Sequence, residues 1–188
     1  MPPKHRTVYR IKVMLNGTKP PIWRRLLVSS DTDLVGLHAI IQVAMGWTDS
    51  HLHQFIAGGE RYREPDPDFD DDALPEAGVR IDSLLKREKH WITYEYDFGD
   101  GWEHKITLEK ILPDEGGAVV PKCIDGRRGR PPEDVGGVYG YARFLLIYND
   151  KAHPEHKEMV EWAGEDFDPE GFDIVEVNGI LADAHRRA

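Results

Sequence analysis

The segment 94–104, YEYDFGDGWEH, constrains the fold more than any other part of the chain, because it encodes a β-hairpin. Apolar residues alternate on both sides of the glycine-rich turn, so each predicted strand has one apolar face. These faces comprise Ile92, Tyr94, Tyr96 and Phe98 before the turn, and Trp102, His104, Ile106 and Leu108 after it. A three-residue loop at 99–101 would place Phe98 opposite Trp102, whereas a two-residue turn would place it opposite a charged residue. We therefore predict the three-residue loop and a buried Phe98.

Hydrophobic periodicity along the rest of the chain predicts an α+β fold. The predicted strands are 9–15, 22–28, 51–57, 60–63 and the two arms of the hairpin; the predicted helices are 34–45, a turn at 81–85, 139–148, 154–163 and about 168–184. This order is typical of a β-grasp-like mixed sheet wrapped on one helix, with a long β-hairpin and docked C-terminal helices. We expect a single domain over 1–188, in which 1–112 form the sheet-plus-helix core and 113–188 form a Gly/Pro-rich loop and the docked helices.

The composition excludes several classes of protein. The chain has 188 residues, of which 40% are hydrophobic and 31% charged, enough for one buried core and not typical of disorder. It has no run approaching the ~20 apolar residues of a membrane helix, so we expect no membrane association. A solitary Cys123 has no partner for an intramolecular disulfide, which favours a cytoplasmic location. The net charge of −10, partly concentrated in a predicted solvated loop at 64–72, opposes tight generic nucleic-acid binding.

Several separated motifs together resemble one known family. Besides the hairpin segment they are IWRRL at 22–26, LHAIIQVAMGW at 37–47, HLHQF at 51–55, PPEDVGG at 131–137, GYARFL at 140–145 and FDPEGFDIVEVNGIL at 167–181. In this order they resemble the plasmid pRiA4b ORF-3-like family over nearly the full length of the chain. The resemblance implies a shared fold and a link to plasmids and mobile elements, since members are passengers of insertion elements. It implies no settled biochemical activity.

Four histidines are candidates for metal ligation. His51 and His53 lie two apart in a predicted strand, so both point to one face and could bind one metal. His38 or His104 could complete the ligand set. However, Phe55 shares the face of the first pair, and the other two histidines lie among apolar residues, as structural histidines do. We therefore predict structural roles for the histidines, no bound transition metal and no cofactor.

Carboxylates near the hairpin tip offer a second candidate site. Asp97, Asp100 and Glu103 could bind a divalent cation or carry out acid–base catalysis. The alternative is that the aspartates stabilise the turn through backbone N–H groups, while Glu103 lies on the polar face of its strand. We favour this structural alternative.

A basic loop, KCIDGRRGR, precedes the PPEDVGG motif and offers a binding site. Arg127, Arg128 and Arg130 could clamp a phosphate or carboxylate through forked donors, and the aromatic residues Trp102 and Tyr96 could add contact area. The loop lacks the Gly-Lys-Ser/Thr ending of a P-loop. We expect the PPEDVGG motif to anchor this loop against the hairpin.

Two functional hypotheses follow, and they differ in class. The favoured one is a non-enzymatic interaction module, linked to mobile elements, in which an acidic surface and a groove between the hairpin and the C-terminal helices bind an unknown protein partner. The alternative is a metal-dependent hydrolase or nuclease. Its site would comprise His51, His53, Asp97, Asp100 and His104. Whether the chain is an enzyme stays open at this point.

Overall fold

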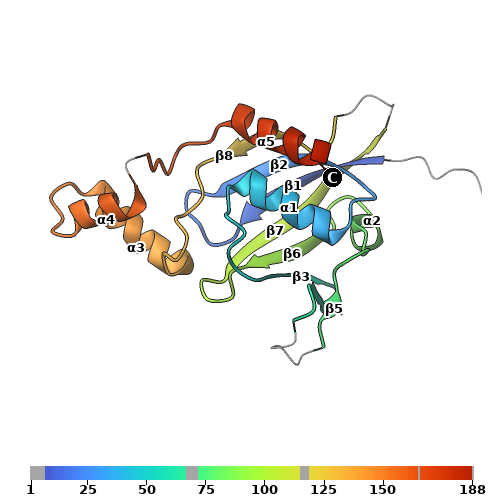
Figure 1. The fold of residues 1–188 in the computed structure, drawn as a ribbon, viewed down its shortest axis with the longest axis horizontal. Helices are drawn as coiled ribbons and strands as arrows, with labels where there is room; N and C mark the ends of the chain where they lie inside the picture. Colours follow the sequence, from blue (N-terminus) through green and yellow to red (C-terminus); the bar gives the residue numbers. More distant parts are fainter. Residues whose placement is uncertain (1–6, 67–71, 115–118, 165, 188) are drawn as a thin grey trace, which may run out of the picture.

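The computed structural model describes residues 7–66, 72–114, 119–164 and 166–187, and these residues have an α+β fold (Figure 1). They form one eight-stranded sheet in the order β5-β4-β3-β6-β7-β1-β2-β8, antiparallel throughout except between β4 and β5. The strands are β1 (Thr7–Leu15), β2 (Ile22–Ser29), β3 (His53–Ala57), β4 (Glu60–Arg63), β5 (Leu74–Pro75), β6 (Trp91–Tyr96), β7 (Trp102–Pro113) and β8 (Lys122–Arg127). The α+β class is confirmed, while the finer comparison with a β-grasp sheet stays a prediction.

Five helices accompany the sheet within the described residues. They are α1 (Leu34–Met45), α2 (Ile81–Leu84), α3 (Gly137–Asn149), α4 (His156–Ala163) and α5 (Ile174–Arg187). No helix in this part of the chain combines the length and apolar character needed to cross a bilayer. Residues 67–71 of the predicted acidic loop lie outside the described residues.

The helix α1 lies across one face of the sheet, beside α5 (Figure 1). It begins after Asp33, whose Oδ1 accepts a hydrogen bond from the Gly36 N–H at 2.9 Å. It ends at Gly46, whose φ of 92° is left-handed and suits glycine. Its apolar side packs on a core of fully buried residues from the central strands, including Ile11, Val13, Leu26, Phe55, Tyr94, Trp102, Ile106 and Leu108.

The predicted register of the hairpin is wrong. Tyr96 lies opposite Trp102 and Tyr94 lies opposite His104, so the loop spans 97–101 instead of 99–101. Asp97 leaves the strand with a φ of 59°, and its Oδ1 accepts hydrogen bonds from the N–H groups of Gly99 and Asp100. The apolar faces still match in this register. Phe98, however, lies in the loop and is only partly buried, so the prediction of a buried Phe98 is also wrong.

The second half of the chain contains a strand that the sequence did not indicate. β8 pairs with β2 at the edge of the sheet. The side-chain amide of Asn178, on α5, binds the N–H and C=O of Cys123 in β8, both at 2.8 Å. In this way α5 covers the outer edge of the sheet.

The C-terminal helices are placed differently from one another. α5 packs on β8 and α1, whereas α3 and α4 pack on each other to one side of the sheet (Figure 1). The predicted start of the last helix near 168 is wrong. Residues 168–173 are not helical and contain one turn at 169–170, and Asp173 Oδ1 accepts hydrogen bonds from the N–H groups of Val175 and Glu176. The expected division of the chain near residue 112 stays a prediction.

Candidate functional site

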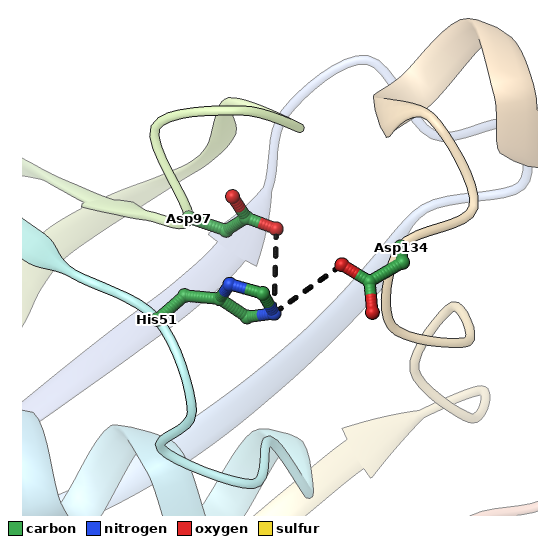
Figure 2. Close-up of side chains that lie close together, drawn as sticks. All are labelled: His51, Asp97 and Asp134. Atoms are coloured by element: carbon green, nitrogen blue, oxygen red, sulfur yellow. Dashed lines mark ion pairs between the residues drawn. The ribbon is translucent and has the colours of Figure 1, made fainter.

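Three loops bring four side chains together at one end of the central strands. His51 precedes β3, Asp97 opens the hairpin tip, and Glu133 and Asp134 belong to the loop before α3. Figure 2 shows the side chains of His51, Asp97 and Asp134 pointing toward one another. We call these four residues the His51 cluster. The predicted strand at 51–57 begins only at His53, so His51 lies in a loop and does not share a strand face with His53.

The distances between His51 Nε2 and the carboxylate oxygens of the cluster are longer than hydrogen bonds and close to the spacing of ligand atoms around one metal ion. His51 Nε2 lies 3.5 Å from Asp134 Oδ1, 3.7 Å from Asp97 Oδ2 and 3.8 Å from Glu133 Oε2. An N–H···O hydrogen bond spans only about 2.7–3.2 Å, so none of these contacts is one. Two donors bound to one ion at about 2.1 Å and at tetrahedral angles lie about 3.4 Å apart. The donor atoms of His51, Asp97 and Asp134 all lie within 4.8 Å of one another, which is close enough to share a single cation.

Asp97 is held by its own turn. Its side chain is only 9% exposed. The Oδ1 atom accepts hydrogen bonds from Gly99 N–H at 2.9 Å and Asp100 N–H at 3.3 Å. These bonds direct the other oxygen, Oδ2, toward His51, as outer hydrogen bonds orient a metal-binding carboxylate.

The Glu133 carboxylate is also oriented by hydrogen bonds to one of its two oxygens. Its Oε1 accepts hydrogen bonds from the N–H and hydroxyl of Thr48, at 3.1 and 3.0 Å. Its Oε2, which faces His51, is buried and has no hydrogen-bond partner among the described residues. A buried carboxylate oxygen without a partner costs free energy unless a cation or a proton compensates it.

Asp134 completes the cluster from the most exposed position. Its side chain is 74% exposed and its φ is 57°. The loop that carries it is fixed to the hairpin tip, since Gly136 N–H donates to Asp100 Oδ2 at 3.1 Å. The predicted anchoring of the PPEDVGG motif against the hairpin is therefore confirmed. Asp100 anchors this loop and does not face His51, while Glu103 is exposed on β7, opposite Glu95.

His38 and His53 form a separate pair behind the cluster. Their rings stack with centroids 3.6 Å apart. His38 contacts the Tyr94 hydroxyl at 2.8 Å and Asp49 Oδ1 at 2.9 Å, and His53 Nε2 contacts Glu76 Oε2 at 3.0 Å. Burial, together with the neighbouring His53 ring, lowers the pKa of His38. These contacts tie the pair into the side-chain network around α1.

His104 is fully buried inside the sheet. Its Nε2 accepts a hydrogen bond from the Trp47 indole N–H at 3.1 Å, and its Nδ1 lies 3.3 Å from the Tyr94 carbonyl oxygen, to which the neutral ring donates. Burial lowers the pKa of His104 to about 4, so the ring is neutral at physiological pH. Both ring nitrogens therefore have partners other than a metal.

The predicted binding arginines do not point to one ligand. Arg127 is exposed at the end of β8. Arg128 is 4% exposed, donates to the Pro20 carbonyl and forms a 2.7 Å ion pair with Glu170. Arg130 donates to the Pro131 carbonyl and lies over the Trp47 ring. These contacts fix the loop between the sheet and the 168–171 turn.

The two predicted aromatic binding residues lie in the core. Tyr96 and Trp102 are each 0% exposed. The Tyr96 ring packs edge-on against His51, and its hydroxyl accepts a hydrogen bond from Ser50 N–H at 3.1 Å. Tyr96 thus positions the loop that carries His51.

Two members of the His51 cluster, Glu133 and Asp134, were not identified as site residues from the sequence. They appeared only as part of the anchoring motif PPEDVGG. The signal that could have found them is an adjacent carboxylate pair in a glycine- and proline-rich loop that is fixed to an acidic hairpin tip.

The fold and the His51 cluster define an α+β protein with a histidine–carboxylate site. The chain belongs to the plasmid pRiA4b ORF-3-like protein family, whose model matches residues 7–176, and the predicted family is thereby confirmed. It is 36% identical over 179 residues to the uncharacterized protein y4hQ of Sinorhizobium fredii, covering 94% of this chain and 92% of that protein. Its fold is similar to the crystal structure of MM3350, a protein of unknown function from Methanosarcina mazei Go1. That match has a TM-score of 0.83 and 36% identity, and covers 92% of this chain and 98% of the other.

Proposed function

We propose that the chain binds one divalent metal ion at the His51 cluster and acts as a metal-dependent hydrolase. The observation that supports this is the arrangement of three carboxylate oxygens at 3.5–3.8 Å from one imidazole nitrogen. One of these oxygens, Glu133 Oε2, is buried without a hydrogen-bond partner among the described residues. A cation bound by His51, Asp97 and Asp134 would offset the repulsion among the carboxylates and place a positive charge near that buried oxygen.

The donor set indicates the kind of metal. One imidazole nitrogen with carboxylate oxygens suits Mn²⁺, Fe²⁺ or Zn²⁺. The site is accessible, because the side chains of His51 and Asp134 are 27% and 74% exposed. A metal with an open coordination position polarises a substrate oxygen and supplies a hydroxide nucleophile at neutral pH. Asp134 is the most exposed member of the cluster, so solvent would reach a bound ion beside this side chain.

This proposal changes the membership of the site expected from the sequence. His51 and Asp97 remain, while His53, His104 and Asp100 have other partners in the fold. Asp134 takes their place as a donor, and Glu133 Oε2 lies 3.8 Å from His51 Nε2. The proposal also departs from the expectation of no bound metal, because Asp134 adds a donor beside His51 and Asp97 that the sequence did not place there.

The first prediction concerns metal affinity. Chelator-treated protein, titrated with Mn²⁺ and separately with Zn²⁺ in a calorimeter, should bind one ion of at least one of them per chain. His51→Ala and Asp97→Asn should each weaken binding by at least about tenfold, since even outer-shell changes cost that much. Asn at 97 retains the Oδ1 acceptor for the turn, so the loop should keep its shape.

Two matched variants serve as controls. Glu103→Gln removes an exposed carboxylate from the same hairpin, and His90→Ala removes a histidine outside the cluster; neither should change the metal affinity. Equal binding by the protein and His51→Ala would refute the metal site. Metal binding without metal-dependent hydrolysis of a panel of nitrophenyl esters and phosphates would refute the hydrolase and leave a structural cation.

A further inference from the structure

The helices α3 and α4 form a groove of about 540 Å³ on the surface. Its apolar lining residues are Val135, Phe144, Ile147, Met159 and Trp162. α4 has no fully buried residue, although Met159, Trp162 and Ala163 give it an apolar side. Trp162 is 48% exposed. Met159 and Ala163 pack against the core, so Trp162 is the part of this apolar side that is left accessible to another chain.

The edge of the groove is acidic. Glu155, which precedes α4, and Glu158 and Glu161 within it follow one another at a spacing of three residues, and Asp134 also lines the groove. Among the described residues that line the groove, Arg143 is the only cation, and it forms a 3.0 Å ion pair with Glu155. Lys157, outside the groove, lies 3.7 Å from Glu161. The groove therefore carries a net negative charge around its apolar lining residues.

We propose that this groove docks a basic amphipathic helix of a partner protein. The apolar lining residues would contact apolar anchors at i, i+3, i+4 and i+7 of such a helix, and the glutamates would pair with Lys or Arg on its flanks. A second copy of this chain is disfavoured, since the net charge is −10 and the acidic edge of one groove would meet another acidic surface. The proposal does not depend on the metal site.

The test uses a synthetic peptide of about 16 Leu and Lys residues with a helical leucine stripe, measured by fluorescence anisotropy in the presence of chelator. The first control peptide has the same composition of Leu and Lys in scrambled order. The second control peptide keeps the leucine stripe but has Glu in place of every Lys. We expect binding of the striped Lys peptide only. The double variant Glu158→Lys/Glu161→Lys should weaken that binding by at least about tenfold.

A matched charge reversal elsewhere on the chain distinguishes the effect of the groove's glutamates on peptide affinity from the effect of the net charge. Glu60→Lys/Glu103→Lys changes the net charge equally at two exposed strand positions, and should leave the affinity within about twofold. Equal binding of the scrambled peptide, or equal weakening by both double variants, would overturn the proposal. Sedimentation that shows a dimer broken by Trp162→Ser would overturn it too, because the occupant would then be a second copy.

Discussion

At the scale of single residues, His104 determines how the fold responds to acid. Burial holds its pKa at about 4, below the ordinary value of 6.5. Between these pH values the unfolded chain binds a proton that the folded chain does not, so the free energy of unfolding falls as the pH falls. The contribution of the buried, neutral His104 ring to the free energy of unfolding is fully present above about pH 6.5. It declines by about 3 kcal/mol in total as the pH falls to about 4. The lowered pKa of His38 acts in the same direction.

This prediction is checked by urea unfolding and by NMR. The unfolding free energy should be lower at about pH 5 than at about pH 7, and the ring protons of His104 should show no titration in that range. His104→Gln keeps the site neutral, so its unfolding should depend less on pH, whereas His90→Gln, outside the core, should leave the dependence unchanged. A His104 ring that titrates near its ordinary value would contradict the buried neutral state.

At the scale of elements, the contact between the hairpin tip and the loop before α3 holds the His51 cluster together. Gly137, which opens α3, has a φ of 67°, and a Cβ there would lie 2.4 Å from the Asp100 carbonyl oxygen. Gly137→Ala must therefore separate the two loops. We expect a loss of unfolding free energy of about 2–4 kcal/mol and a weaker metal affinity, since Asp134 moves with the loop.

Gly58→Ala is the matched control for this variant. Gly58 has a similar φ of 61°, but a Cβ at this position would have no atom within 4 Å. It should show only the cost of a left-handed alanine, about 1 kcal/mol, and no change in metal affinity. Chemical unfolding and the metal titration measure both effects. If the two variants behave alike, the loop contact has no role beyond backbone strain.

The elements that the sequence predicted well are those specified by local signals. α1 has the predicted bounds because Asp33 caps its start and Gly46 ends it. The hairpin register failed because the Asp97 side chain binds its own loop and ends the strand early, a local competition that alternation alone does not show. β8 was missed because its partners, β2 and Asn178, lie far away in the sequence.

The same distinction applies to the candidate site. His51 was proposed with His53 as a pair on one predicted strand, and Asp97 was proposed as a carboxylate near the hairpin tip. Asp134 joins them only because α3 starts against the hairpin tip, which is a tertiary contact. His104 looked equally suitable as a ligand on its strand face, and only its partners, Trp47 and Tyr94, show that both ring nitrogens are occupied.

At the scale of the whole molecule, charge sets what the surface attracts. The net charge is −10, and Arg128 and Arg130 are bound to protein groups instead of facing solvent together. We expect duplex DNA to bind no more tightly than non-specific association, roughly 10⁻⁴ to 10⁻⁶ M, and to dissociate as salt rises. Anisotropy with labelled duplexes at about 150 mM salt tests this. Nanomolar, sequence-selective binding that Arg127→Ala abolishes would contradict it.

Asp134 belongs both to the His51 cluster and to the end of the α3–α4 groove. A metal ion held by this carboxylate cancels negative charge that a basic helix would otherwise meet, within the roughly 8 Å over which charges act at physiological salt. The two proposed ligands are therefore antagonists joined through one side chain. Linkage requires reciprocity, so a docked helix weakens metal binding by the same factor by which the metal weakens docking. Release of a partner would then raise the affinity of the His51 cluster for the ion.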